Sequence, residues 1–509
     1  MKSCFLIFGL IAHLFAAQPD TAVVATVGPY PISAGELLTS FEFGPAFVKR
    51  TNDPLREHLK YMTFECLLAL EGKNHNLDES EFVKQRVHGL EEDNAVEHLY
   101  RQEILSQVKL SPLQIEQDIE KAKRKITFRW IFASSSESAK RIYGRIMSQH
   151  SFDSLFALQI DSAVTPGNRS QETTQLNLER DNPDLAAAMK GLNPGRVSKP
   201  VQGKDGWYIV HLDSLWFAPI TTQTEYAELK NQAVETRRKI EADKLADQYI
   251  KDLMDQNYPV IKAEGFNILR AYLADKGLSH DTKVTWKIPS TFMTEAGPQP
   301  ISGSGKYLGR TLVTFGKRSL QVRDYVDWYD IRQFQLDTKS EGAFTSSVKK
   351  TIWKMVQDKL LSERAYARGL NRIPAVIGET NQWERKLLYL AERSKLLRTI
   401  DLSETNIRSY YQKNEKRYRR ADGTAAKFSE IKNSVKTDYY YSEEASVLMK
   451  AIDELKKKYP VSIDELLLNR LSSGVRRDSH SIDAVIYKPG GTFPHVAFPT
   501  IDEAWSRIR

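Results

Sequence analysis

Thiol and imidazole side chains could do covalent or metal chemistry in this chain, but their number and spacing restrict both. The 509 residues include two cysteines, Cys4 and Cys66, and ten histidines. Two thiols cannot build a disulfide scaffold or a Cys-based zinc or iron–sulfur site. The histidines are scattered without an HExxH motif, and the sequence has no glycine-rich phosphate loop. We therefore expect no metal ion and no cofactor.

The first seventeen residues have the features of a secretory signal. A basic start at Lys2 precedes a short apolar run over residues 4–17, which ends in two alanines. The run is shorter than the roughly 20 apolar residues that span a bilayer, and a Gln-Pro-Asp sequence ends it. We expect residues 1–17 to be cleaved near Ala17 and the mature protein to be exported, with no integral membrane span.

Loss of this leader would leave Cys66 as the last thiol of the chain. An exported protein with one cysteine cannot form an internal disulfide. Cys66 shares a helical apolar pattern with Phe64 and Leu67, so we expect it to be a core residue rather than a nucleophile.

The charge of the chain is basic but evenly mixed. The 73 Lys and Arg against 65 Asp and Glu leave a net charge of +8, with the two signs interspersed along the sequence. Export and the lack of a basic stripe argue against a nucleic-acid partner. Anionic lipid head groups and acidic polypeptides remain open as weak partners.

An internal repeat organises most of the chain. First a short strand, a glycine turn and a helix start recur, with Ser33 as an expected N-cap in the first copy. A long helix recurs next, followed by a helix that begins after a serine. The matched pairs are residues 25–37 with 313–325, 67–77 with 360–370, and 104–115 with 396–407.

A fourth match lies at a different distance and reveals an insertion. Residues 226–260 match 428–461, which follow the third match almost at once in the second copy. In the first copy about 95 residues intervene, so we expect an inserted domain there. We also expect the early and late segments of each copy to pack together. The expected segments are a signal peptide (1–17), helical module 1, first part (18–125), the inserted domain (126–219), module 1, second part (220–270), a Gly- and Pro-rich linker (271–309), module 2 without an insertion (310–468) and a C-terminal extension (469–509).

The inserted interval predicts a small α+β domain and carries a family resemblance. Its motifs are Phe152-Asp153-x-Leu155, Asp161-Ser162, Gly195-Arg196-Val197-Ser198-x-Pro200-Val201 and Gly206-Trp207-Tyr208-Ile209-Val210-x-Leu212. These motifs resemble the parvulin-type, PpiC-like peptidyl-prolyl cis-trans isomerases, and the flanking helical segments resemble the chaperone module of SurA-like periplasmic chaperones. The resemblance implies a mainly α fold with an inserted α+β parvulin-like domain and a duplicated helical chaperone module.

The resemblance also indicates site residues. Parvulins place two histidines in the middle of the domain, and at those positions this sequence has Trp130 and Tyr208. Strand alternation puts His211 on the face opposite Tyr208. We therefore expect His211 to have a structural role and not to replace either of the family's two histidines. The family's Cys or Asp is kept as Asp161, which is the candidate catalytic residue.

The prolyl pocket implied by the resemblance is altered as well. The family's Met and Phe correspond to Asp181 and Leu185, and its Thr corresponds to Gly203. A charged Asp181 would weaken an apolar pocket, because burying an unpaired carboxylate is costly. We therefore expect the domain to be degenerate and to have little isomerase activity.

These observations favour an ATP-independent envelope chaperone that binds unfolded outer-membrane or secreted proteins in the periplasm. An active prolyl isomerase and a non-catalytic assembly scaffold are the alternatives, and an isomerisation assay beside an aggregation assay separates the three. Tyrosines on predicted helices could line a client groove, although helix packing explains them as well. They are Tyr410, Tyr411, Tyr439, Tyr440 and Tyr441.

Overall fold

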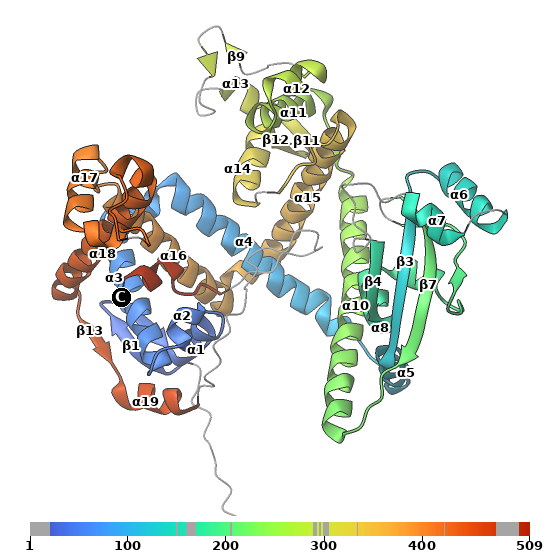
Figure 1. Ribbon diagram of the computed structural model, residues 1–509, viewed down its shortest axis with the longest axis horizontal. Helices are drawn as coiled ribbons and strands as arrows, with labels where there is room; N and C mark the ends of the chain where they lie inside the picture. The colour runs from blue at the N-terminus through green and yellow to red at the C-terminus, as the bar shows by residue number, and fades with distance from the viewer. Residues whose placement is uncertain are drawn as a thin grey trace, which may run out of the picture. The chain divides into compact units, whose positions relative to one another are not determined.

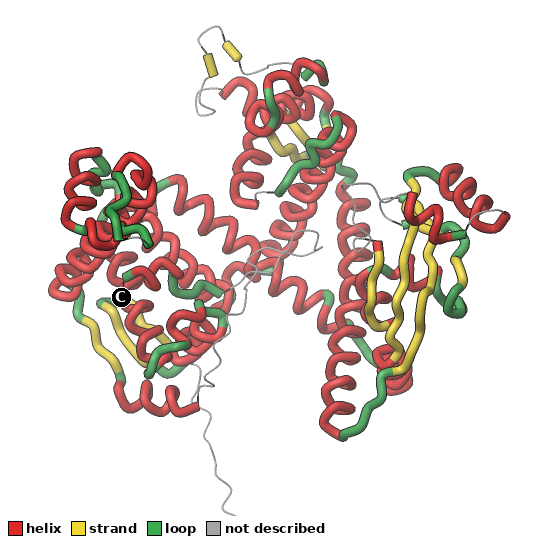
Figure 2. Tube along the Cα trace, in the orientation of Figure 1, coloured by secondary structure: helices red, strands yellow, loops and turns green. Residues whose placement is uncertain are grey.

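The protein is mainly helical, with an α+β domain inserted in the first copy of the repeat (Figures 1 and 2). This confirms the expected fold class. Two compact units divide the chain, and each is described by itself: the first unit takes residues up to His98 and from Tyr258 onward, and the second unit is Leu99–Asn257. The computed structural model describes residues 21–148, 151–158, 169–203, 206–288, 293–294, 297–298, 305–332, 334–421, 423–474 and 498–508, so the expected signal peptide lies outside the described residues.

The two copies of the repeat share most of their elements, in the same order. The first copy consists of β1 (Val23–Val27), β2 (Tyr30–Ser33), α1 (Ala34–Glu42), α2 (Ala46–Lys49), α3 (Pro54–Asn74), α4 (Glu81–Glu103), α5 (Pro112–Lys123), α10 (Gln223–Asn257), β8 (Val260–Ile261) and α11 (Ala263–Gly277). The second copy has no counterpart of α2 among the described residues and consists of β11 (Thr311–Phe315), β12 (Arg318–Gln321), α14 (Val322–Arg332), α15 (Glu341–Ala367), α16 (Pro374–Leu397), α17 (Glu404–Lys413), α18 (Phe428–Lys458), β13 (Val461–Ile463) and α19 (Glu465–Gly474).

Backbone conformations recur at matched positions of the two copies. Gly28 and Gly316 have φ of 53° and 57° in the turns of the two hairpins. Asn76 and Gly369 have φ of 56° and 70° where the long helices α3 and α15 have ended. Left-handed backbone favours glycine and asparagine, so these positions explain why small or amide residues stand there. Ser33 caps α1 as expected, since it accepts a hydrogen bond of 3.1 Å from the backbone N–H of Glu36.

The strand pairings join the two copies to each other. β13, from the late segment of the second copy, pairs antiparallel with β1 of the first, and Val461 lies opposite Val27. β8, from the late segment of the first copy, pairs with β11 of the second, and Val260 lies opposite Thr314. The expectation that early and late segments of one copy pack together is therefore wrong for these strands. Both hairpins offer the same kind of antiparallel edge, so backbone hydrogen bonding does not distinguish one late strand from the other.

The linker and the inserted domain differ in extent from the predicted boundaries. Residues 271–277 belong to α11, where Ala271 and Ala274 are fully buried, and α12 (His280–Thr285) follows them. The helical part of the chain thus reaches further into the interval 271–309 than its Gly and Pro content indicated. The second unit is also wider than residues 126–219, because α5 and α10 are part of it.

The core of the first unit includes the last residues of the chain. α3 packs against α16 and α18, and the 3-10 turn Glu503–Arg507 places Trp505 in this core with 1% of its surface exposed. The Trp505 ring stacks on Tyr61 with ring centroids 5.5 Å apart, and its Nε1 donates a hydrogen bond of 2.9 Å to Glu65. The end of the predicted C-terminal extension is therefore part of the core.

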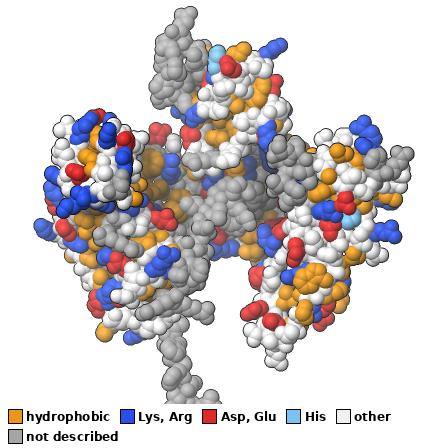
Figure 3. Space-filling model, in the orientation of Figure 1, with side chains coloured by type: hydrophobic (Ala, Val, Ile, Leu, Met, Phe, Trp, Pro, Cys, Tyr) orange, Lys and Arg blue, Asp and Glu red, His pale blue; other side chains and the backbone are white. Residues whose placement is uncertain are grey.

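The surface and the environment of Cys66 agree with the sequence patterns. On the face seen in Figure 3, basic and acidic side chains are mixed rather than gathered in one stripe. Cys66 is buried in the core, and burial raises the pKa of its thiol to about 12. Among the described residues, no helix is both long and apolar enough to cross a bilayer.

A buried histidine in this core predicts a pH-dependent stability. His58 is fully buried, with its Nε2 2.9 Å from the Ser40 hydroxyl, and burial together with Lys386 and Lys49 lowers its pKa from 6.5 to about 3. Unfolding restores an ordinary histidine pKa near 6.5. Between about pH 6.5 and pH 3, His58 is therefore protonated in the unfolded chain but neutral in the folded chain. Below about pH 6.5 the free energy of unfolding should fall by up to about 1.4 kcal/mol per pH unit, and this loss continues towards pH 3.

The His58→Gln variant should show a smaller loss. Between pH 6.5 and 5, the free energy of unfolding, measured in urea, should fall by about 2 kcal/mol more for the wild type than for the variant. His280→Gln, which changes an exposed histidine, is the control and should behave as the wild type. If the free energy of unfolding depends on pH equally in the wild type and in His58→Gln, His58 is not the source of the pH dependence.

Candidate functional site

The inserted domain is a five-stranded antiparallel sheet with helices on both faces. The strand order is β4-β3-β7-β5, and β6 pairs with the same strand β7. The two long central strands β3 and β7 pair from Arg124 opposite Phe217 to Ala133 opposite Trp207 (Figure 1). Its elements are β3 (Arg124–Ala133), α6 (Ser136–Ser148), α7 (Phe152–Leu158), β4 (Ser170–Thr174), α8 (Gln175–Asp181), α9 (Pro183–Ala188), β5 (Arg196–Val197), β6 (Val201–Gln202) and β7 (Trp207–Phe217).

Alternation along the central strands sorts the candidate residues between the two faces. Phe128 and Val210 are fully buried against Leu178 and Leu185 of α8 and α9, and Trp130 and Tyr208 are partly buried beside this cluster. Ile131 and Ile209 point to the other face, where they pack with Phe152 and Phe156 of α7. The expected separation of Tyr208 and His211 by strand alternation is confirmed, since the His211 ring stacks on Phe152 at 4.9 Å.

Ring packing holds Tyr208 in place. Its ring meets that of Phe132 edge-on, with centroids 5.4 Å apart. A Cβ added at Gly203 would lie 2.8 Å from the Tyr208 ring, and one added at Gly206 would lie 2.4 Å from Phe132. The two glycines therefore make room for the two rings, and Gly203 stands where the resemblance expects a threonine.

The two pocket positions have different environments. Leu185 is buried beside Met189 and forms part of the apolar floor under Trp130 and Tyr208. Asp181 lies exposed at the end of α8 and pairs with Arg180 at 2.7 Å. The expected cost of a buried carboxylate at Asp181 is therefore absent, because its charge stays in water beside an arginine.

His211 belongs to an ion-pair network on the α7 face. Its Nδ1 lies 2.6 Å from Asp213, and Arg129 donates three hydrogen bonds to the same carboxylate, at 2.7, 2.9 and 3.1 Å. Burial alone would raise the pKa of Asp213, but these hydrogen bonds hold it below its ordinary value. Arg129 also donates to Asp153 at 2.7 Å. His211 is thus a structural residue, as expected, and is turned away from the Trp130 face.

The topology and these positions agree with a sequence comparison. The sequence model of the family described as the PPIC-type PPIASE domain matches residues 121–222. Residues 121–222 form a PPIC-type domain. No curated protein matches the chain.

Solved structures that resemble the chain are peptidyl-prolyl isomerases and chaperones. The PrsA peptidyl-prolyl isomerase of Bacillus anthracis is 20% identical with a TM-score of 0.22, over 28% of this chain and 64% of that one. A SurA-like chaperone of Campylobacter jejuni is 17% identical with a TM-score of 0.20, over 46% and 97% of the two chains. PrsA of Bacillus subtilis is 16% identical with a TM-score of 0.17, over 46% and 93%. The chain spans less than two thirds of the Bacillus anthracis protein, and the assignment of the PPIC-type domain rests on the family match and on its own topology.

A buried ion pair that the sequence did not indicate ties the PPIC-type domain to the helices that flank it. Arg237 of α10 donates two hydrogen bonds of 2.7 Å to Asp118 of α5, and only 7% and 1% of these side chains are exposed. Glu179 of α8 lies 3.1 Å from the same guanidinium. The long sequence separation hides this network, because its members become neighbours only when α5 and α10 pack together.

The remaining predicted site residues lie elsewhere. Asp161 of the PPIC-type domain is outside the described residues, so its role stays a prediction. Tyr439 of α18 is buried, and its ring lies 5.5 Å from that of Tyr410 on α17. The Tyr411 hydroxyl donates a hydrogen bond to the carbonyl of Ala426. The Tyr440 ring meets that of Tyr441 edge-on, and Tyr441 is 40% exposed. Client binding by these tyrosines stays a prediction, with Tyr441 as the accessible member.

Proposed function

We propose that the protein is an ATP-independent chaperone of the periplasm that binds extended segments of unfolded outer-membrane or secreted proteins. In this proposal the PPIC-type domain contacts polypeptide without isomerising it. The observation that carries the second part is that Trp130 and Tyr208 face α8 and α9. By the sequence resemblance these two residues correspond to the family's two histidines. The match of residues 121–222 to the PPIC-type domain supports a polypeptide as the ligand.

The physical argument concerns hydrogen bonding at the twisted peptide bond. Rotation about a peptide bond has a barrier of about 20 kcal/mol, which an isomerase lowers by binding the twisted bond in a desolvated pocket. Indole and phenol rings cannot supply the imidazole pair that the family uses. Packing against Gly203 and Phe132 also fixes the Tyr208 ring, so it cannot turn to replace an imidazole. The apolar floor of Leu185 and Met189 remains able to hold an apolar side chain.

Two assays on the purified chain test this function. We expect little acceleration of cis–trans exchange in a proline tetrapeptide, together with clear suppression of aggregation of an unfolded outer-membrane protein. Because the proposal separates client binding from isomerisation, Asp161→Ala should leave the suppression nearly unchanged. Asp252→Ala, at an exposed site on α10, is the matched control.

Rapid isomerisation that disappears in Asp161→Ala but persists in Asp252→Ala would replace this proposal with an active prolyl isomerase. If neither isomerisation nor suppression of aggregation is observed, the result would favour an assembly scaffold with fixed partners.

A further inference from the structure

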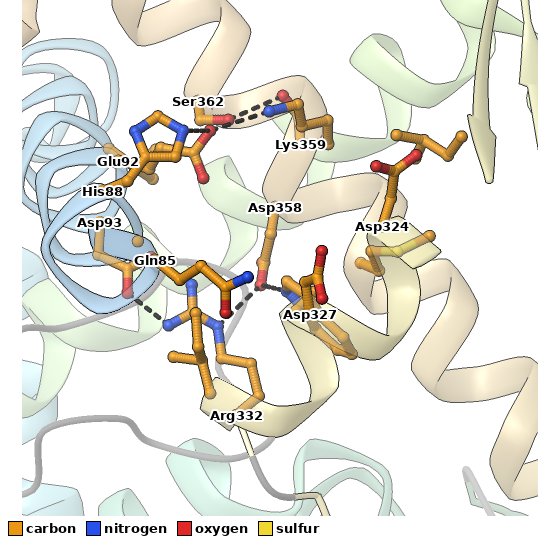
Figure 4. A pocket seen from close by; sticks show the side chains of 16 residues that line it. Gln85, His88, Glu92, Asp93, Asp324, Asp327, Arg332, Asp358, Lys359 and Ser362 are labelled. Carbon is orange, nitrogen blue, oxygen red and sulfur yellow. Dashed lines mark hydrogen bonds and ion pairs between the residues drawn. The ribbon is translucent and has the colours of Figure 1, made fainter. Parts of the chain in front are cut away.

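A cavity of about 280 Å³ lies in the first unit, apart from the PPIC-type domain. Helix α4 of the first copy forms one wall, and β12, α14 and α15 of the second copy form the others (Figure 4). Its volume is below the roughly 300–1,000 Å³ of pockets that enclose whole small molecules, and it suits one or two side chains. The apolar lining residues are Val96, Leu320, Trp328, Ile331 and Met355.

Most charges around the cavity are neutralised by one another. Asp93 accepts two hydrogen bonds of 2.5 Å from Arg332, and Glu92 lies 3.0 Å from Lys359. Burial raises the pKa of Asp93 to about 6 in spite of this pairing. Asp358 accepts a hydrogen bond of 3.0 Å from the Trp328 indole and lies 3.1 Å from Lys354. These pairs form a rigid and nearly neutral wall.

Two carboxylates at the cavity have no cationic side-chain partner among the described residues, although Asp324 accepts a hydrogen bond of 2.7 Å from the backbone N–H of Gln321. Asp324 and Asp327 lie one helical turn apart on α14, and no lysine, arginine or histidine of the described residues forms an ion pair with either of them (Figure 4). Burial and the charge of Asp324 raise the pKa of Asp327, Arg323 lowers it, and Glu81 raises it further. Because the other charged groups at the cavity are paired and these two carboxylates are not, the cavity carries excess negative charge beside an apolar floor.

We propose that this cavity receives a lysine or arginine side chain of an extended polypeptide, with an apolar neighbour of that residue on the cavity floor. The proposal rests on the proposed function, since it assumes a polypeptide ligand. Charge complementarity selects a cation, because Asp324 and Asp327 lack one. Long basic side chains place an apolar stem on apolar surface, which the cavity floor of Val96, Ile331 and Met355 supplies.

Fluorescence anisotropy with the full chain tests the choice of ligand. The probes are two labelled nonapeptides that alternate leucine with arginine or leucine with glutamate. We expect the arginine peptide to bind at least about tenfold more tightly, and this preference to shrink as salt is added. Equal affinity for the two peptides, or no binding of either, would overturn the proposal.

A double variant tests the site. Asp324→Asn with Asp327→Asn keeps the side-chain shapes and should weaken binding of the arginine peptide at least about tenfold. The control is Asp252→Asn with Asp255→Asn, two exposed aspartates with the same spacing on α10, which line no part of the cavity and should have no effect. Undiminished affinity in the first variant would overturn the proposal.

Photo-crosslinking to the wild-type chain locates the peptide independently of any variant. A benzoylphenylalanine in place of one leucine should label residues 81–98, 320–332 or 355–362, and labelling confined to other residues would overturn the proposal. Failure of the proposed function would look different, because the wild type would then bind the arginine peptide in this cavity without suppressing aggregation.

Discussion

Replacing Trp505 with alanine is expected to lower the free energy of unfolding of the first unit by about 3–5 kcal/mol. The indole is 1% exposed and stacks on Tyr61 and Tyr389 with ring centroids 5.5 and 6.1 Å away. Its loss would leave a large cavity and would remove the N–H that donates to Glu65 at 2.9 Å. Urea unfolding of the variant beside the wild type measures the change.

Trp353→Ala is the matched control for this variant. Trp353 on α15 is 37% exposed, so the same truncation there should cost about 1 kcal/mol or less. Trp505→Phe should fall between the wild type and Trp505→Ala, because it keeps most of the ring contact and loses only the hydrogen bond to Glu65. Equal and small losses for Trp505→Ala and Trp353→Ala would show that the end of the chain does not stabilise the core.

Separating the two copies of the repeat is expected to unfold the helical modules. A fragment of residues 21–288 lacks β13 beside β1 and lacks α16 and α18 beside α3. A fragment of residues 305–508 lacks β8 beside β11 and lacks α3 beside α16. Each fragment alone would expose the apolar surface that the other covers, so neither module should unfold cooperatively by itself.

Co-expression of the two fragments is the control and should restore a complex. Size-exclusion chromatography should show both fragments in one peak, with a thermal transition close to that of the intact chain. The PPIC-type domain should fold in the first fragment in either case, since its core lies within residues 124–217. Cooperative unfolding of the 305–508 fragment alone as a monomer would show that the two copies do not depend on each other.

Several features of the chain could be predicted from sequence because they are local. Gly28 and Gly316 occupy equivalent left-handed turns, and Ser33 caps the helix that follows it. The period of two along β7 correctly put Tyr208 and His211 on opposite faces, since strand side chains alternate whatever the strand packs against. The order of elements and the insertion in the first copy also follow from such local patterns.

Tertiary structure alone decided which distant segments meet. Matched hairpins have interchangeable backbone edges, so the sequence could not show that Val461 pairs with Val27 while Val260 pairs with Thr314. Asp181 was expected to weaken the apolar pocket with a buried charge, but the packing of α8 leaves its carboxylate in water beside Arg180. The sequence could not show the excess charge of Asp324 and Asp327 either. That excess depends on which carboxylates form ion pairs with basic residues of α4, α14 and α15, and these contacts exist only after the two copies have packed together.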